Sequence, residues 1–237
     1  MSKKVWIIFA GVCVLLLAGL VFISNANRIN VDDVDVNAIQ GPSEQSGNIG
    51  DHVFGKADSP VVLIEYGDFQ CPGCGSAFPT VDKVVEKYKD KIAFVFRNFP
   101  LTGIHPNARV AAAAAEAAGQ QGKFWEMYRM LYENQNSWSG LGTSERTDYF
   151  VSLAEDLELN RDTFLAHLSD NTISQKINFD LAVGKKAGVD ATPTFFLNGE
   201  KMTSETYQNE EAFEKAITDA LEKTKTESQS AANEEEK

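Results

Sequence analysis

Apolar residues within residues 51–222 are spaced as in a domain with strands toward its two ends and helices between them. VVLIEY at 61–66 is a short, continuous apolar run, which is typical of a strand covered on both faces. In KIAFVFRNFP at 91–100, Ile92, Phe94 and Phe96 alternate with Ala93 and Val95, which predicts a second strand. Between the two runs, TVDKVVEKY places its apolar residues along one side of a helix. This order predicts a βαβ unit with parallel pairing and a right-handed crossover. Pro79 predicts a kink or break in the helix.

A long helical pattern follows, and then the chain returns to strand. Residues from about 103 to 187 show helical spacing in several segments, beginning with an alanine run that ends at Gly119. TPTFFLNGEKM at 192–202 predicts a hairpin that turns at Asn198-Gly199, and a last helix ends near residue 222. The expected fold class is therefore α/β, a small mixed sheet with helices on both faces and a helical subdomain inserted midway.

The N-terminus has the pattern of a membrane-spanning helix. Residues 5–23 carry no charge, and at about 1.5 Å per residue such a run can cross a hydrocarbon core of about 30 Å. Lys3 and Lys4 precede it, so the N-terminus is expected to stay in the cytoplasm. We interpret residues 1–26 as an uncleaved anchor, and a cleaved signal peptide is the alternative. Both interpretations place residues 27–237 outside the cytoplasm.

Two polar segments flank the expected domain. Residues 27–50 are turn-rich and show no sustained period, so we expect a linker between membrane and domain. Residues 223–237 are charged and predict a disordered tail. Without residues 1–26 the chain has 20 basic and 34 acidic residues, a net charge of −14. This charge argues against nucleic acid as a partner.

The exported part contains only two cysteines, Cys71 and Cys74, because Cys13 lies in the apolar run. Disulfides persist outside the cytoplasm, but a bridge over two residues closes too short a loop to stabilise much. Redox chemistry and metal binding therefore remain as the two candidate roles of the cysteine pair. Zinc usually requires four ligands, and the three histidines show no ligand spacing, so we expect no metal.

The position of the pair between strand and helix has a chemical consequence. Cys71 is expected at the helix N-terminus, where unpaired N–H groups and the helix dipole stabilise a thiolate. In such motifs the cysteine pKa falls from about 8.5 to roughly 3.5–7.5. Stabilising the thiolate makes the disulfide a stronger oxidant. Cys74, one turn later and more buried, is suited to resolve a mixed disulfide, and Cys71 to form it.

Taken together, the motifs resemble a known family. CPGC after VVLIEY, together with TPTFFLNG, resembles the thioredoxin superfamily, and the long helical insertion resembles the DsbA-like thiol:disulfide oxidoreductases in it. FRNFPL and KFWEMYRMLYENQ also look like that group. The resemblance covers about residues 51–222. It implies a thioredoxin fold with an inserted helical subdomain at about 103–187.

The resemblance also implies roles for individual residues. The family places a cis-proline against the active-site disulfide, and Thr192-Pro193 matches that position. Its backbone would pair with a substrate strand, and Thr192 would touch the disulfide. Glu65 matches a buried acid that serves the second cysteine as a proton shuttle, with a pKa raised by burial. Pro72-Gly73 would tune the potential and contact substrate, and a proline in the first position resembles the oxidising branch.

The expected function is that of an extracytoplasmic thiol oxidase, which introduces disulfides into exported proteins through Cys71 and Cys74. The resemblance implies re-oxidation by a quinone-linked membrane partner of the DsbB or VKOR-like kind. We expect a membrane-anchored monomer with no cofactor except its own disulfide. One alternative is a reductase or isomerase on the same fold, although residues 27–50 are too few for a dimerisation domain. The other alternative is a non-enzymatic module that binds a metal or a protein.

Overall fold

The structure is a computed structural model that describes residues 6, 9–17, 19 and 29–235. The anchor expected at residues 1–26 lies largely outside the described residues. Within the described part of the chain, no helix combines the length and the apolar character needed to cross a membrane.

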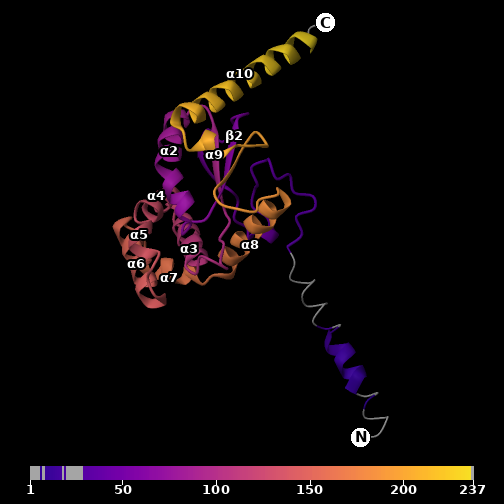
Figure 1. Ribbon diagram of the computed structural model, residues 1–237, viewed down its shortest axis with the longest axis vertical. Helices are drawn as coiled ribbons and strands as arrows, with labels where there is room; N and C mark the ends of the chain where they lie inside the picture. Colours follow the sequence, from indigo (N-terminus) through magenta and orange to yellow (C-terminus); the bar gives the residue numbers. More distant parts are fainter. Residues whose placement is uncertain (1–5, 7–8, 18, 20–28, 236–237) are drawn as a thin grey trace.

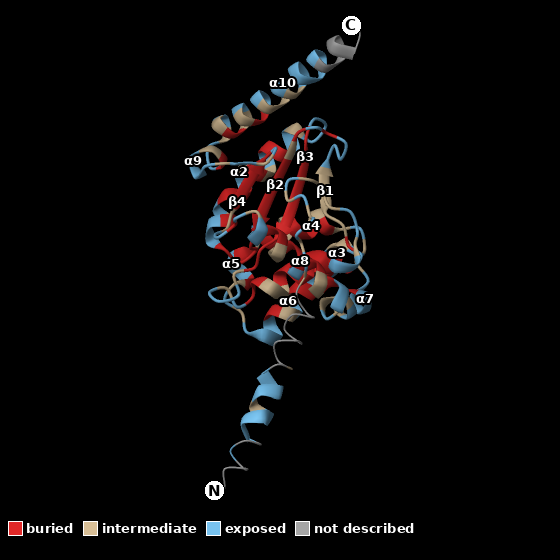
Figure 2. Ribbon diagram, turned by 90° about the vertical axis from the view of Figure 1, so that its right-hand side faces the viewer, coloured by how far each residue is buried: buried red, intermediate tan, exposed pale blue. Residues whose placement is uncertain are grey.

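A five-stranded mixed sheet with strand order β1-β3-β2-β4-β5 forms the centre of the domain (Figure 2). β2 and β3 pair in parallel, as predicted, and the other neighbours pair antiparallel. The β4–β5 hairpin turns at Asn198 and Gly199, whose φ angles of 48° and 82° are those of a tight hairpin turn. The edge strand β1 was not predicted, because its four residues are too few to show a period. The strands are β1 (His52–Gly55), β2 (Val62–Gly67), β3 (Ala93–Asn98), β4 (Thr194–Leu197) and β5 (Glu200–Lys201).

Helices connect and cover the strands (Figure 1). α2 (Pro72–Tyr88) joins β2 to β3 and continues through Pro79, so the predicted break is absent. Its residues Val81, Val84 and Val85 are buried and hold the helix beyond the proline against the core. The inserted subdomain lies between β3 and β4, as expected. Its helices are α3 (Ala108–Gly119), α4 (Phe124–Glu133), α5 (Gln135–Trp138), α6 (Thr143–Asp156), α7 (Arg161–Leu168) and α8 (Asn171–Lys186).

Different elements pack against the two faces of the sheet. Leu63, Phe94 and Phe195 belong to the larger core, together with buried residues of α2, α4 and α10 (Glu210–Glu235). Ile64 and Val95 alternate with them and pack against α8 and apolar residues of the segment before β1. Because both faces are covered, Glu65 of β2 is buried although it is an acid. The short helices η1 (Glu44–Ser46) and α9 (Ser204–Tyr207) complete the described elements of the domain.

Residues 29–50 are packed onto the domain, so the prediction of a free linker over 27–50 is wrong for this part. The Arg97 guanidinium is fully buried and donates to the carbonyl oxygens of Val36 at 2.7 Å and Ala38 at 2.6 Å. It also pairs with Asp51 at 2.8 Å. A buried cation needs several acceptors, and the carbonyl groups of this segment supply two of them.

The C-terminal tail also differs from the prediction. Residues 223–235, expected to be disordered, continue α10, which extends away from the body of the domain (Figure 1). Lys, Glu and Ala are frequent in this segment, and their helix propensity is high enough to extend an already formed helix.

Candidate active site

The end of β2 and the start of α2 position the cysteine pair. Cys71 is the N-cap of α2, Pro72 is its first residue, and Cys74 lies one turn into the helix. Both cysteines are free thiols, so the site is in its reduced form. Cys71 is 8 % exposed and Cys74 only 1 %. Cys71 is thus the more accessible thiol of the two, and its role as attacking thiol, with Cys74 as resolving thiol, stays a prediction.

The surroundings of Cys71 favour its thiolate. A hydrogen bond from the Cys74 side chain lowers the pKa of Cys71 most. The proximity of Thr192 and the backbone N–H groups of Gly73 and Cys74 add to this effect, and burial opposes it. Together they lower the Cys71 pKa to about 5. At neutral pH the reduced enzyme therefore carries a negative charge at the first turn of α2.

Cys74 has the opposite character. Burial raises its pKa well above the ordinary value, and the hydrogen bond to Cys71 and the nearby Glu65 raise it further. One proton therefore stays on Cys74 over the physiological pH range, while Cys71 is ionised. The two thiols thus differ in charge at neutral pH: Cys71 is a thiolate and Cys74 keeps its proton.

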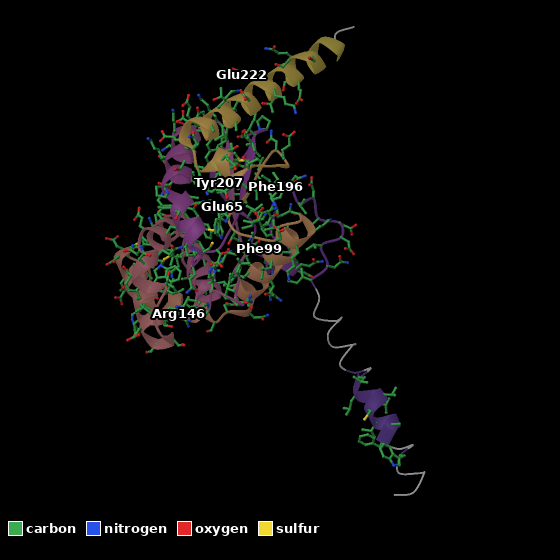
Figure 3. All side chains as sticks on the ribbon, viewed as in Figure 1. Glu65, Phe99, Arg146, Phe196, Tyr207 and Glu222 are labelled. Carbon is green, nitrogen blue, oxygen red and sulfur yellow. The ribbon has the colours of Figure 1, made fainter. Side chains whose placement is uncertain are left out.

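Glu65 is fully enclosed on the face of β2 that belongs to the larger core (Figure 3). Burial raises the pKa of its carboxyl to about 8, although a hydrogen bond from the Tyr128 hydroxyl lowers it in part. A carboxyl group that titrates near pH 8 can both give and take a proton at neutral pH. The expected desolvation of Glu65 is confirmed, and its role as a shuttle stays a prediction.

Thr192-Pro193 forms the opposite wall of the site. The peptide bond between them is cis, as predicted. The carbonyl oxygen of Thr192 lies 3.4 Å from the sulfur of Cys71 and accepts a hydrogen bond from its protonated thiol. A Cβ atom at Gly73 would lie 3.5 Å from the Cδ atom of Pro193. Pro72, Gly73, Thr192 and Pro193 thus share one surface with Cys71, and their contact with substrate stays a prediction.

The inserted subdomain holds the loop in front of α2. The side-chain nitrogen of Gln135 donates to the carbonyl oxygens of Phe69 at 2.7 Å and Cys71 at 2.9 Å. A Cβ atom at Gly75 would lie 2.4 Å from the Gln135 amide oxygen, so a larger residue at this position would push the amide away from its present place. Sequence reasoning missed Gln135, because nothing in its local pattern indicates which distant backbone it meets.

Asp68 and His105 were also missed. The Asp68 carboxylate is buried and lies 2.7 Å from the Nδ1 atom of His105. The carbonyl oxygen of Asp68 accepts from the backbone N–H of Cys71 at 3.0 Å. His105 lies just outside helix α3, which begins at Ala108 with Asn107 as its N-cap. A usable signal existed, because each residue follows one of two parallel strands whose carboxyl ends meet.

No cluster of three or more histidine, cysteine or acidic side chains suited to a metal ion occurs among residues 29–235 or the other described positions. The cysteine pair itself offers two sulfur atoms that can exchange with a third sulfur atom.

Comparison with known proteins identifies the family of the chain and relatives with a similar fold. The family described as Thioredoxin matches residues 47–219, and the chain belongs to this family. The fold is similar to that of alpha-DsbA1 from Wolbachia pipientis, with a TM-score of 0.65, 25 % identity and 75 % and 94 % of the two chains covered. It is also similar to oxidised BdbD from Bacillus subtilis, with a TM-score of 0.63, 24 % identity and coverage of 78 % and 98 %.

The curated relatives carry a different kind of name. The chain is 41 % identical over 171 residues to Na(+)/H(+) antiporter NhaA 1 of Salinispora arenicola, which is 72 % of this chain and 25 % of that protein. A second relative, Na(+)/H(+) antiporter NhaA of Herminiimonas arsenicoxydans, is 30 % identical over 85 % of this chain and 30 % of its own length. The chain thus spans between 22 % and 30 % of the length of the curated relatives it matches.

The fold and the site define the class of protein. The chain is a thioredoxin-family protein whose fold is of the DsbA-like type, as its sequence predicted. The same kind of fold occurs in MdbA, a thiol-disulfide oxidoreductase from Corynebacterium diphtheriae, with a TM-score of 0.58, 20 % identity and coverage of 77 % and 93 %.

Proposed function

We propose that the protein oxidises pairs of cysteines in exported proteins on the outer side of a cell membrane. The observation that carries this proposal is the opposite electrostatics of the pair: the environment lowers the pKa of Cys71 to about 5 and raises that of Cys74. Stabilising the Cys71 thiolate favours the reduced enzyme, so electrons flow from the client to the disulfide.

The reaction takes place in two exchanges. A client thiolate attacks the Cys71 sulfur of the oxidised enzyme, the Cys71–Cys74 bond breaks, and Cys74 leaves as a thiolate that takes a proton from Glu65. A second client thiolate attacks the client sulfur in the mixed disulfide, and Cys71 leaves as a stable thiolate. The client loses two electrons and gains a disulfide, and the enzyme gains both electrons.

The backbone beside Thr192 and Pro193 binds the client in this proposal. It offers an edge next to Cys71, where an extended client segment can pair in the manner of an added strand. The surface formed by Pro72 and Gly73 contacts the same segment.

The remaining parts of the proposal concern location and partners. Residues 1–26 anchor the chain in the membrane as a monomer, and a quinone-linked membrane protein of the DsbB or VKOR-like kind re-oxidises the cysteine pair. No nucleic acid partner is part of the proposal, and neither is a cofactor beyond the disulfide. The curated relatives are named as Na(+)/H(+) antiporters. Sodium/proton exchange is a property of those longer proteins and is not part of the function proposed here.

The direction of the reaction is tested by the redox potential, measured in equilibrium with glutathione. We expect a value more positive than about −200 mV, in the range of oxidising members of the superfamily. A value near about −270 mV, where thioredoxin lies, would instead support a reductase.

Client engagement is tested with Cys74→Ala, which removes the resolving thiol. We expect disulfide-linked clients to accumulate on Cys71 in cells and to be released by dithiothreitol. Cys71→Ala is the matched control and should trap none. If Cys74→Ala traps no client and the purified protein contains a metal in unit stoichiometry, a metal-binding module is the better interpretation.

A further inference from the structure

Helix α4 of the inserted subdomain brings two tyrosines into the core beside Glu65. Tyr128 and Tyr132 are four residues apart, so both lie on the same face of the helix. Their exposed fractions are only 2 % and 5 %, and their ring centroids are 5.1 Å apart. The two tyrosines thus share one helix and one helix face, and both are almost completely buried.

The two hydroxyl groups nevertheless differ in their partners. The Tyr128 hydroxyl donates to the Oε2 atom of Glu65 at 3.1 Å, and both groups are buried. The Tyr132 hydroxyl is buried without a hydrogen-bond partner among the described residues. Only Tyr128 can therefore act on the Glu65 carboxyl through a hydrogen bond.

The Tyr128 ring is held in place by aromatic neighbours. Phe69, Phe78 and Phe96 meet it edge-on, with ring centroids 5.9, 5.8 and 5.1 Å away. Glu65 is equally fixed at its backbone, because β2 pairs on one side with β3 and on the other with β4. The hydrogen bond thus joins two rigid elements, and the carboxyl cannot rotate without breaking it.

We propose that Tyr128 is a positioning residue for proton transfer at Cys74, because its hydroxyl occupies Oε2 and leaves Oε1 of Glu65 to carry the proton. This inference rests on the proposed shuttle role of Glu65. When Cys74 leaves as a thiolate, the proton moves from Oε1 to the sulfur, and the Tyr128 hydroxyl stabilises the carboxylate that remains. In the reverse step Oε1 takes the proton from the Cys74 thiol.

Oε1 is the carboxyl oxygen that the Tyr128 hydroxyl does not contact, because that hydroxyl binds Oε2. A Cβ atom at Gly67 would lie 3.0 Å from Oε1 and 2.2 Å from the Phe96 ring. The glycine therefore leaves just enough room for the carboxyl group beside the end of the strand.

The consequence of losing the hydroxyl follows from the charge of the carboxylate. A hydrogen bond to a buried charged group favours the charged form, so Tyr128→Phe makes Glu65 hold its proton up to a higher pH. A loss of the size usual for such bonds corresponds to a shift of about one to two pH units. Tyr132→Phe removes a hydroxyl that makes no such bond and should shift nothing.

The experiment uses the reduced full-length protein and glutathione disulfide as the oxidant. Cys71 forms a mixed disulfide and releases one glutathione, and Cys74 then displaces the second glutathione and closes the Cys71–Cys74 bond. Acid quenching and mass spectrometry give the rate of this second step between pH 5 and pH 10. This rate is measured without a client protein and without a redox potential. It therefore stays informative even if the protein proves to be a reductase and not an oxidase.

We expect the pH midpoint of the second step to rise by about one to two units in Tyr128→Phe, with the wild-type rate recovered at the high-pH limit. The Tyr132→Phe profile should superimpose on that of the wild type, and Tyr128→Phe should add nothing to Glu65→Gln. An unshifted Tyr128→Phe profile would overturn the inference. So would an equal shift in Tyr132→Phe, because it would indicate general repacking of the core.

A second measurement covers the case in which Tyr128→Phe does not fold. Carbon-detected NMR of the wild-type protein follows the Glu65 carboxyl through its titration, together with the hydroxyl proton of Tyr128. A slowly exchanging hydroxyl proton whose shift follows the titration of Glu65 supports the inference. A hydroxyl proton that does not respond to Glu65 contradicts it.

Discussion

The His105 ring binds the Asp68 carboxylate at 2.7 Å, and this pair ties the loop after β3 to the loop before α2. The same carboxylate accepts the backbone N–H of Leu101 at 2.8 Å and that of Gln70 at 2.8 Å. The Asp68 carboxylate thus accepts three hydrogen bonds and is buried. The backbone carbonyl oxygen of Asp68 accepts a fourth, from the N–H of Cys71. The geometry of the nucleophile depends on a contact 37 residues away.

His105→Ala is expected to lower the free energy of unfolding by about 1–3 kcal/mol, because it removes a partner from a buried charged group. Urea unfolding of the oxidised protein measures this change. The amide of Cys71 should also exchange with solvent faster, since the loop that holds it loses one of its ties. Lys83→Ala is the control, because its ion pair with Glu210 is exposed and should contribute at most about 1 kcal/mol. Equal stability losses in the two variants would contradict the role of the pair.

The redox potential should change its pH dependence near pH 5. Below the Cys71 pKa of about 5, reduction takes up two protons with two electrons, and the potential falls by about 59 mV per pH unit. Above it only Cys74 takes up a proton, because its pKa is raised, and the slope falls to about 30 mV per unit. Equilibration between pH 4 and pH 8 measures both slopes. A single slope through this range would mean that Cys71 is not a low-pKa thiol.

Glu65→Gln should stabilise the oxidised protein at high pH and not at low pH. The Glu65 pKa rises from its ordinary value of 4.5 to about 8 in the fold, so the folded state holds a proton that the unfolded state loses between these values. Stability therefore falls as the pH rises through this window. Glutamine removes the dependence, and the gain at pH 8 is on the order of a few kcal/mol.

Urea unfolding at pH 5, 6.5 and 8 tests this prediction. The oxidised protein is used because neither cysteine titrates in it. A gap between Glu65→Gln and wild type that stays constant with pH would contradict the assigned shift. The same variant should slow the closing of the Cys71–Cys74 bond, because no carboxyl remains to take the proton.

Arg97→Met is expected to destabilise the domain by about 3–5 kcal/mol, because it leaves the fully buried Asp51 carboxylate without one of its cations. Lys176 remains 3.2 Å from the same carboxylate, so some of the charge stays balanced. Residues 29–50 should become open to proteolysis, since they lose the guanidinium that holds their carbonyl groups. Lys201→Met is the matched control, because its ion pair with Asp190 is exposed. Unchanged resistance to protease in Arg97→Met would contradict the packing of this segment.

Local patterns were enough to predict much of the fold. The apolar run of β2 and the alternation in β3 gave the parallel pair, and Asn198-Gly199 gave the hairpin. Two segments were misjudged because they have no period of their own. Residues 29–50 take their structure from Arg97 and from the second face of the sheet, which a local pattern cannot show.

The sequence by itself determined the reactive pair and its place at a helix start, because both depend on neighbours within a few residues. Its resemblance to the DsbA-like family implied the buried acid at Glu65 and the cis-proline that faces the pair. Only the tertiary structure decided which partners these groups meet: Tyr128 for Glu65, His105 for Asp68 and Gln135 for the loop carbonyl groups. Such contacts join residues 37–66 positions apart. They form because packing excludes water and leaves each buried polar group to find a partner within the protein.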